Sequence, residues 1–123
     1  MNENISLGSI TIDCKDAEKL SGFYAGLLGW EKITLFGKPA LRNGSSLFLF
    51  VPEDDYVPPI WPEQPGKQQK QIHLDFVVSD VPAFVKKAES LGAVKAEAQF
   101  GGEYFTTMLD PAGHPFCLCA SGE

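Results

Sequence analysis

The sequence predicts an α+β protein built from two βαβββ modules of similar length. In the 123-residue chain, a stretch of alternating polar and apolar residues is followed by an amphipathic helical stretch and a glycine, and this order occurs twice. The aspartates that begin the helical stretches, Asp16 and Asp80, are 64 residues apart. The glycines that end them, Gly29 and Gly92, are 63 residues apart. The two halves therefore keep nearly the same register, as an internal repeat requires.

The first module is expected over residues 6–51. Residues 9–14 alternate between polar and apolar side chains, which predicts a strand with two unlike faces. Asp16 is a favourable N-cap for a helix that Gly29 would end. Turn residues then separate three short strands, expected at about 31–36, 39–42 and 46–51.

The second module is expected over residues 72–120. Residues 72–78 again alternate, and Asp80 is the N-cap of a second helix before Gly92. Glycine and proline turns separate three further short strands, expected at 95–99, 105–109 and 115–119.

A proline-rich connector is expected at residues 52–71, because this stretch contains five of the nine prolines and can form neither a helix nor a central strand. It carries Trp61 between Ile60 and Pro62, and an indole is costly to leave in water. The connector is therefore expected to lie across the body of the protein, with Trp61 either as a lid over a ligand or as a structural plug or subunit contact.

Composition excludes several classes of function. The net charge of −6 and the dispersed basic residues give no patch for nucleic acid. No apolar run is long enough for a membrane span, and the first residues do not resemble a signal peptide. The three cysteines, Cys14, Cys117 and Cys119, show no CxxC spacing and are expected to be free thiols in a reducing compartment. A cytoplasmic protein without nucleic-acid or membrane partners is expected.

Three motifs resemble the vicinal oxygen chelate superfamily, which includes glyoxalase I, fosfomycin and bleomycin resistance proteins and extradiol dioxygenases. They are the segments Phe23–Trp30, His73–Asp80 and Asp110–Leu118, and the resemblance is greatest to the glyoxalase-like domain branch. It covers nearly the whole chain as a single domain. It implies eight strands in a curled mixed sheet with a concave pocket and the helices outside, and homodimers are frequent among such proteins.

The resemblance also implies where a metal ion would bind. In metal-using members the ligands come from the first and last strand of each module, positions that align here with Ser9, Phe48, His73 and Cys117. Phenylalanine cannot bind a metal and serine is a weak ligand, so no metal or other cofactor is expected. If a metal is present, His73 and Cys117 would hold it, with a third ligand from Asp75, Glu103 or a second subunit.

The polar face of the first strand of each module is expected to form the floor of a pocket in the cleft between the modules. His73 and Asp75 are the candidate catalytic pair, since a carboxylate beside an imidazole suits acid/base chemistry near neutral pH. His73 is equally consistent with a half-buried histidine that bonds to Asp75 or to the backbone. The candidate ligand-binding residues are Ser9, Thr11, Phe48, Phe50, Trp61, Tyr104 and Cys117. Cys117 is also consistent with a small apolar core residue.

The leading hypothesis is a metal-independent glyoxalase-like protein that binds a small organic molecule. The sequence fits both a binding protein and an enzyme. One alternative is a metal-dependent lyase, isomerase or dioxygenase that uses His73 with displaced ligands. Another is a drug-sequestering protein similar to the bleomycin resistance proteins, which the acidic composition permits without selecting it. A third is an interaction module whose pocket is vestigial.

Overall fold

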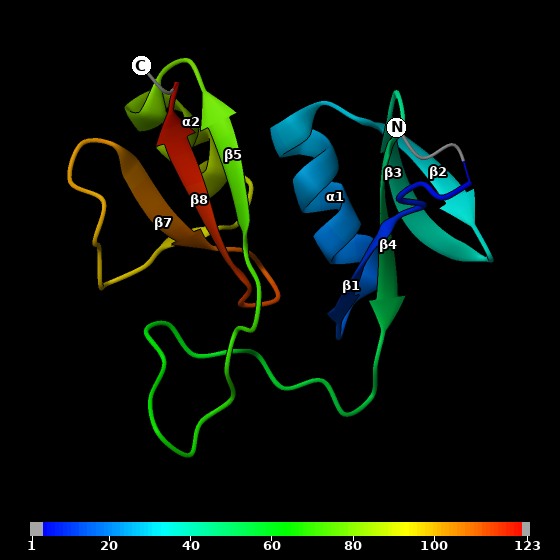
Figure 1. The fold of residues 1–123 in the computed structure, drawn as a ribbon, viewed down its shortest axis with the longest axis horizontal. Coiled ribbons are helices and arrows are strands. Elements are labelled where there is room, and N and C mark those ends of the chain that lie inside the picture. The colour runs from blue at the N-terminus through cyan, green and yellow to red at the C-terminus, as the bar shows by residue number, and fades with distance from the viewer. Residues whose placement is uncertain (1–3, 122–123) are drawn as a thin grey trace. The chain divides into compact units, whose positions relative to one another are not determined.

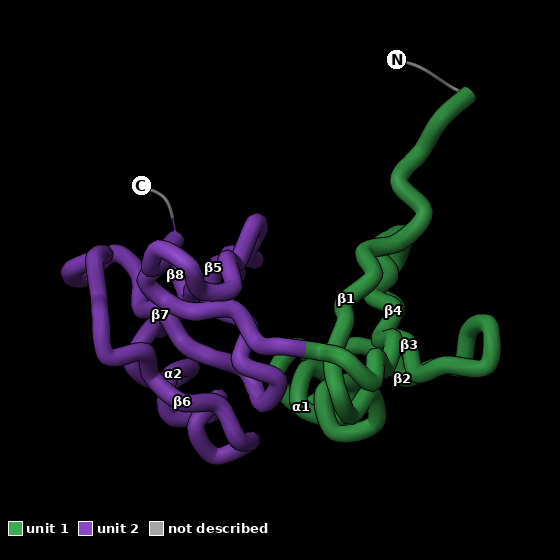
Figure 2. Tube along the Cα trace, turned by 90° about the horizontal axis from the view of Figure 1, so that it is seen from below, with its two compact units in different colours: residues 1–56 green, residues 57–123 purple. Residues whose placement is uncertain are grey.

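The computed structural model describes residues 4–121. It divides into two compact units, unit 1 with residues 1–56 and unit 2 with residues 57–123 (Figure 2). The boundary between the units falls inside the predicted proline-rich connector. Each unit contains one helix and one four-stranded sheet, as the predicted βαβββ repeat requires.

Unit 1 follows the predicted order of one strand, one helix and three strands (Figure 1). Its mixed sheet has the strand order β1-β4-β3-β2, in which β1 is parallel to β4 and the other neighbours are antiparallel. The elements are β1 (Ile10–Cys14), α1 (Ala17–Leu28), β2 (Glu31–Leu35), β3 (Lys38–Asn43) and β4 (Ser46–Pro52).

The limits of α1 confirm both predicted end signals. The side chain of Asp16 accepts a hydrogen bond from the backbone N–H of Lys19, as an N-cap does. Gly29 ends the helix in the left-handed region, at φ 73°, and its N–H donates to the carbonyl of Ala25. The buried face of α1 includes Tyr24, whose ring contacts Phe48 and Phe50 of β4.

Unit 2 repeats the same topology. Its sheet has the order β5-β8-β7-β6, in which β5 is parallel to β8. The elements are β5 (Leu74–Val78), α2 (Val81–Ser90), β6 (Val94–Lys95), β7 (Phe105–Leu109) and β8 (Pro115–Ala120). Asp80 is the N-cap of α2, as predicted, and its carboxylate accepts from the N–H of Ala83.

Two strands of unit 2 are shorter than predicted. The strand β5 begins at Leu74 rather than Ile72, because Gln71 has a positive φ of 58° and turns the chain before the sheet begins. The strand β6 contains only Val94 and Lys95, whereas a strand was predicted over 95–99. Beyond Lys95 the chain no longer pairs with β7 as a strand. Hydrogen bonds from the side chain of Gln99 to the backbone of Thr107 replace the expected pairing.

Phe48 and Phe50, predicted to bind a ligand together with Ser9 and Thr11, lie on the opposite face of the sheet from Thr11. In the β1–β4 ladder Phe48 is paired with Ile10 and Phe50 with Ile12, so both rings lie on the apolar face that α1 covers. The alignment of Phe48 with Cys117 matches Gly44 to Gly113, the last-turn glycines of the two modules. These glycines occupy turns of different length, because β3 and β4 pair up to Asn43 and Ser46 whereas β7 and β8 pair only up to Leu109 and Pro115.

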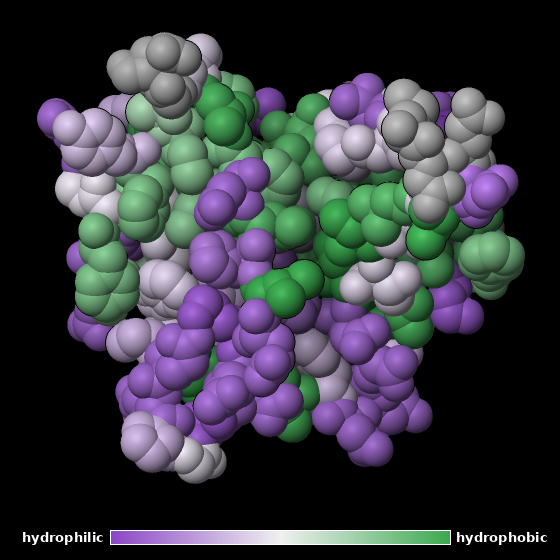
Figure 3. Space-filling model, in the orientation of Figure 1, coloured by the Kyte–Doolittle hydropathy of each residue, from purple (hydrophilic) through white to green (hydrophobic). Residues whose placement is uncertain are grey.

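The connector after β4 forms no strand or helix up to β5. It is the long green loop at the bottom of Figure 1, and the surface in that region is mainly hydrophilic (Figure 3). Pro58 packs against the β7–β8 turn so closely that a Cβ on Gly113 would lie 2.9 Å from the Pro58 Cβ. The connector therefore lies on unit 2.

Candidate functional site

The candidate site lies on one face of the sheet of unit 2. Asp75 of β5 is in register with Cys117 of β8, which is in register with Thr107 of β7. His73 immediately precedes β5 and, two residues from Asp75, shares its face. The side chains of Phe76 and Phe116 point to the opposite face, where their ring centroids are 6.0 Å apart. Three neighbouring strands therefore place an imidazole, a carboxylate, a hydroxyl and a thiol side by side.

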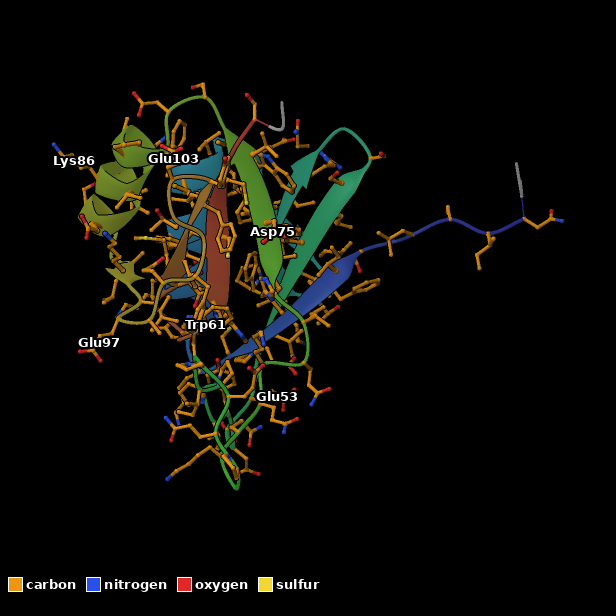
Figure 4. All side chains as sticks on the ribbon, turned by 60° about the vertical axis from the view of Figure 1, so that its left-hand side comes forward. Glu53, Trp61, Asp75, Lys86, Glu97 and Glu103 are labelled. Carbon is orange, nitrogen blue, oxygen red and sulfur yellow. The ribbon has the colours of Figure 1, made fainter. Side chains whose placement is uncertain are left out.

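His73 and Asp75 form the predicted polar pair. The distance from His73 Nε2 to Asp75 Oδ1 is 3.5 Å, and the side chains are 30% and 61% exposed. Figure 4 shows Asp75 projecting from β5. The carboxylate therefore lies beside the imidazole, and both groups are accessible to a ligand. The structure places the two predicted residues side by side, and their catalytic role stays a prediction.

Cys117 forms the floor of this site and is a thiol rather than a thiolate. Its side chain is 2% exposed, and its Sγ lies 3.3 Å from the hydroxyl of Thr107. Burial raises the pKa of the Cys117 thiol; the bond from Thr107 opposes this rise, and Asp75 and Cys119 add to it. The pKa of Cys119 is raised as well, by burial and by Asp75. Without a bound cation Cys117 is not an activated nucleophile.

The raised pKa of Cys117 predicts a loss of stability at high pH. The folded protein holds the thiol proton more tightly than the unfolded chain does. The tighter binding of this proton adds to the unfolding free energy. The added stability is complete below the usual thiol pKa of about 8.5, and it is lost as the pH rises through the higher pKa of the folded protein. In urea unfolding between pH 7 and 10.5, we expect the decline of the unfolding free energy to be shallower in Cys117→Ala than in the parent protein. Identical slopes would contradict the prediction.

Thr107 is held in place by Gln99, and sequence analysis did not identify either residue. The side-chain amide of Gln99 donates to the carbonyl of Thr107 at 2.8 Å and to that of Ala96 at 2.7 Å. Its side-chain oxygen accepts from the backbone N–H of Thr107 at 2.8 Å. Gln99 had been assigned to a predicted strand, so its role as a substitute strand partner was missed. The Gly101-Gly102 pair, two residues after Gln99, is the one sequence signal of an irregular segment there.

Trp61 lies beside His73, and the predicted choice between a lid and a structural plug or subunit contact stays open. Its indole N–H donates to the carbonyl of Ala98 at 2.9 Å. Its ring centroid is 5.9 Å from that of His73 and 5.9 Å from that of Phe100. The ammonium of Lys70 lies 5.1 Å from the Trp61 ring centroid and forms an ion pair with Glu63. The indole is therefore fixed within unit 2 on more than one side, at the lower end of the sheet in Figure 4.

The predicted ligand-binding residue Tyr104 does not join this cluster. Tyr104 is 71% exposed and precedes β7 at the level of Ala120, to which its carbonyl is bonded. His73 lies at the level of Pro115, so five residues of strand, about 16 Å, separate the two along the sheet. Glu103 shares the turn of Tyr104 and is equally remote as a third metal ligand. Ser9 and Thr11 belong to unit 1, where Thr11 is exposed on β1.

The donors in this cluster fit a zinc-type cation. The nearest ligand atoms of His73, Asp75 and Cys117 all lie within 4.8 Å of one another. Ligands of a tetrahedral zinc ion are about 3.3–3.8 Å apart, given bond lengths of about 2.0–2.3 Å, and the His73–Asp75 distance of 3.5 Å falls in this range. Nitrogen, oxygen and sulfur donors are all zinc ligands, and three of them leave one position open. Asp75 therefore occupies the place predicted for the third ligand, whereas the expected absence of a metal stays a prediction.

The two described helices, α1 and α2, lack the length and apolar character that a membrane-spanning helix needs.

Comparison with known proteins gives a family match over residues 9–119, to the glyoxalase-like domain. No curated protein matches the sequence.

Solved structures show the same fold at low sequence identity. A glyoxalase/bleomycin resistance protein/dioxygenase family enzyme from Burkholderia phytofirmans PsJN is 22% identical, with a TM-score of 0.68 over 92% of this chain and 96% of the other. A glyoxalase/bleomycin resistance protein from Albidiferax ferrireducens T118 is 16% identical, with a TM-score of 0.68 over 94% of this chain and 98% of the other. A fosfomycin resistance protein from Listeria monocytogenes is 18% identical, with a TM-score of 0.69 over 97% and 93%. With the family match covering nearly all of both modules, this chain belongs to the glyoxalase-like domain family.

Proposed function

We propose that the protein binds a small organic molecule at the cluster of His73, Asp75 and Cys117, without a metal ion, and that His73 and Asp75 exchange a proton with that molecule. The observation that carries the proposal is the His73–Asp75 contact of 3.5 Å beside the fixed indole of Trp61. A polar pair next to an aromatic wall is the usual composition of a small-molecule site. The proposal agrees with a family that contains both enzymes and resistance proteins.

The geometry assigns distinct roles to the residues of this site. The carboxylate of Asp75, 3.5 Å away, orients the imidazole of His73, which accepts a proton from the bound molecule. The indole of Trp61 offers a flat apolar surface to the remainder of that molecule. The neutral thiol of Cys117 and the hydroxyl of Thr107 close the floor with weak hydrogen-bonding groups.

The two histidines of the chain provide a matched test of this proposal. Trp61 emission in a Trp30→Phe background reports on the site, because the chain has only two tryptophans. This variant is screened against small carboxylates, ketones, aldehydes and phenols, with thermal shift as a second readout. We expect a ligand whose affinity falls at least tenfold in His73→Ala and stays unchanged in His114→Ala, since His114 lies in the β7–β8 turn. Equal affinity in all variants, or no ligand by either readout, would contradict the proposal.

A second candidate function follows from the spacing of the three donors. His73, Asp75 and Cys117 would hold a zinc-type ion, which acts as a Lewis acid toward an oxygen of the bound molecule when present. In that case His73 would serve as a ligand instead of a base, and Cys117 would lose its proton in spite of its raised pKa. The activity would be that of a metal-dependent lyase, isomerase or dioxygenase.

Metal content separates the two candidates. We expect protein purified without a histidine tag to contain zinc, nickel, iron and manganese only in trace amounts by elemental mass spectrometry. Stoichiometric metal that is lost in His73→Ala and in Cys117→Ser but retained in His114→Ala would overturn the metal-independent proposal and establish the second one. Dialysis against a chelator should leave the thermal unfolding temperature of the parent protein unchanged.

A further inference from the structure

Unit 1 contains a cavity that the proposed function does not use. Its volume is about 320 Å³, at the lower end of the range for small-molecule sites. The lining consists of residues 6–10, Trp30 and residues 45–48, all of which belong to unit 1. The cavity lies where the parallel strands β1 and β4 begin, since Ile10 is paired with Phe48 at that end of the sheet. The cavity shares no lining residue with the cluster of His73, Asp75 and Cys117.

Two aromatic rings form a firm wall of this cavity. The ring centroids of Trp30 and Phe48 are 4.8 Å apart, with an angle of 42° between the planes. Phe48 is 5% exposed, and Tyr24 of α1 supports it from behind at a centroid distance of 6.4 Å. Trp30 is only partly buried, so its indole keeps an accessible surface. An aromatic wall of this kind favours a flat ring as the ligand.

The polar groups of the lining are all neutral. They are backbone amides and the hydroxyls of Ser6, Ser9, Ser45 and Ser46, and none of the ten lining residues carries an ionisable side chain. Hydroxyls such as those of Ser9 and Ser46 can both donate and accept hydrogen bonds, so they suit a polar group on a ligand. A charged ligand would lose hydration without gaining a counter-ion here, which is unfavourable. A hydroxyl or carbonyl on the ligand, by contrast, would find partners.

We propose that this cavity is a second binding site, which takes a small neutral aromatic molecule carrying one hydroxyl or carbonyl group. The ring packs on Trp30 and Phe48, and the polar substituent bonds to the serine hydroxyls. The cavity volume of about 320 Å³ suits a ligand with one or two rings. Ser9, predicted from the sequence to bind a ligand, would act in this site.

The indole N–H of Trp30 reports on binding in ¹H–¹⁵N NMR spectra. The chain has two tryptophans, so the Trp61→Phe variant assigns the two indole signals. The probes are benzyl alcohol, benzoate and benzylamine, which are neutral, anionic and cationic at pH 7. We expect benzyl alcohol to shift the Trp30 signal saturably at about millimolar concentration, and the two charged probes to bind at least about tenfold more weakly. An unmoved Trp30 signal, or equal affinity for all three probes, would overturn the proposal.

Blocking variants localise the effect. Ser46→Phe fills the cavity from the exposed end of β4, and we expect it to reduce benzyl alcohol binding at least about tenfold. Ser121→Phe places the same ring on unit 2 and should have no effect. Ser9→Leu is the second blocking variant, should Ser46→Phe lose the dispersed spectrum of a folded protein. Undiminished binding in a folded blocking variant would overturn the proposal. The variant His73→Ala serves as the control that the effect is independent of the site in unit 2.

Discussion

Replacing Phe50 with alanine is expected to lower the unfolding free energy by about 3–5 kcal/mol, the cost of removing a fully buried phenylalanine side chain. Phe50 is 0% exposed, and its ring stacks on that of Tyr24 with centroids 6.2 Å apart and planes 22° from parallel. Phe48 lies at its edge, 6.5 Å away. Because α1 and the sheet enclose the ring, its loss leaves a cavity that the backbone cannot fill. Urea unfolding followed by circular dichroism and by Trp30 emission measures the effect.

The exposed Phe36 provides the matched control. Its side chain is 80% exposed on the turn between β2 and β3, so Phe36→Ala should change the unfolding free energy by no more than about 0.5 kcal/mol. Phe50 was predicted from the sequence to contact a ligand. If Phe50→Ala lost no more stability than Phe36→Ala, the Phe50 ring would not stabilise the core. The prediction that Phe50 contacts a ligand would then be supported again.

Replacing Gly101 with alanine is expected to cost about 3 kcal/mol, at the upper end for an overpacked site. A Cβ at this position would lie 2.4 Å from the carbonyl oxygen of Phe105 and 2.6 Å from its ring. The oxygen belongs to the backbone of β7, so it cannot swing aside as a flexible side chain would. The turn is also closed by a 2.9 Å bond from the N–H of Tyr104 to the carbonyl of Gly101. Thermal and urea unfolding measure the loss.

Gly22 of α1 is the matched control for this substitution. A Cβ there meets nothing within 4 Å, and alanine is the better helix former, so Gly22→Ala should raise the unfolding free energy by about 0.5–1 kcal/mol. Both substitutions add one methyl group, but the expected changes in the unfolding free energy have opposite signs. A stabilising or neutral Gly101→Ala would show that the 101–104 turn can move away from Phe105.

Local chemistry made most of the fold predictable. The carboxylates of Asp16 and Asp80 cap the helices, and Gly29 adopts the left-handed conformation that ends α1. These features depend only on neighbouring residues, so one sequence is enough to find them. The contact between His73 and Asp75 was predictable for the same reason, since the two residues are two positions apart at the start of β5.

Features that depend on pairing between distant segments were not predictable. The register of β4 against β1 decides which face Phe48 takes, and a turn glycine does not fix that register. The donors of Thr107 and Cys117 meet only because β7 and β8 are paired. A side chain such as that of Gln99, which bonds to a backbone eight residues away, has no periodic signature at all.

The side-chain amide of Gln99 also limits intermolecular association at the edge of the sheet. Because β6 contains only two residues, the outer rim of β7 would otherwise present free backbone groups to any passing strand. Gln99 occupies both the N–H and the carbonyl of Thr107 at that rim, and the backbone N–H of Ala96 bonds to the same carbonyl. A foreign strand would have to displace these bonds before it could extend the sheet. The side chain of Gln99, which holds Thr107 in place, thus also hinders intermolecular β-association.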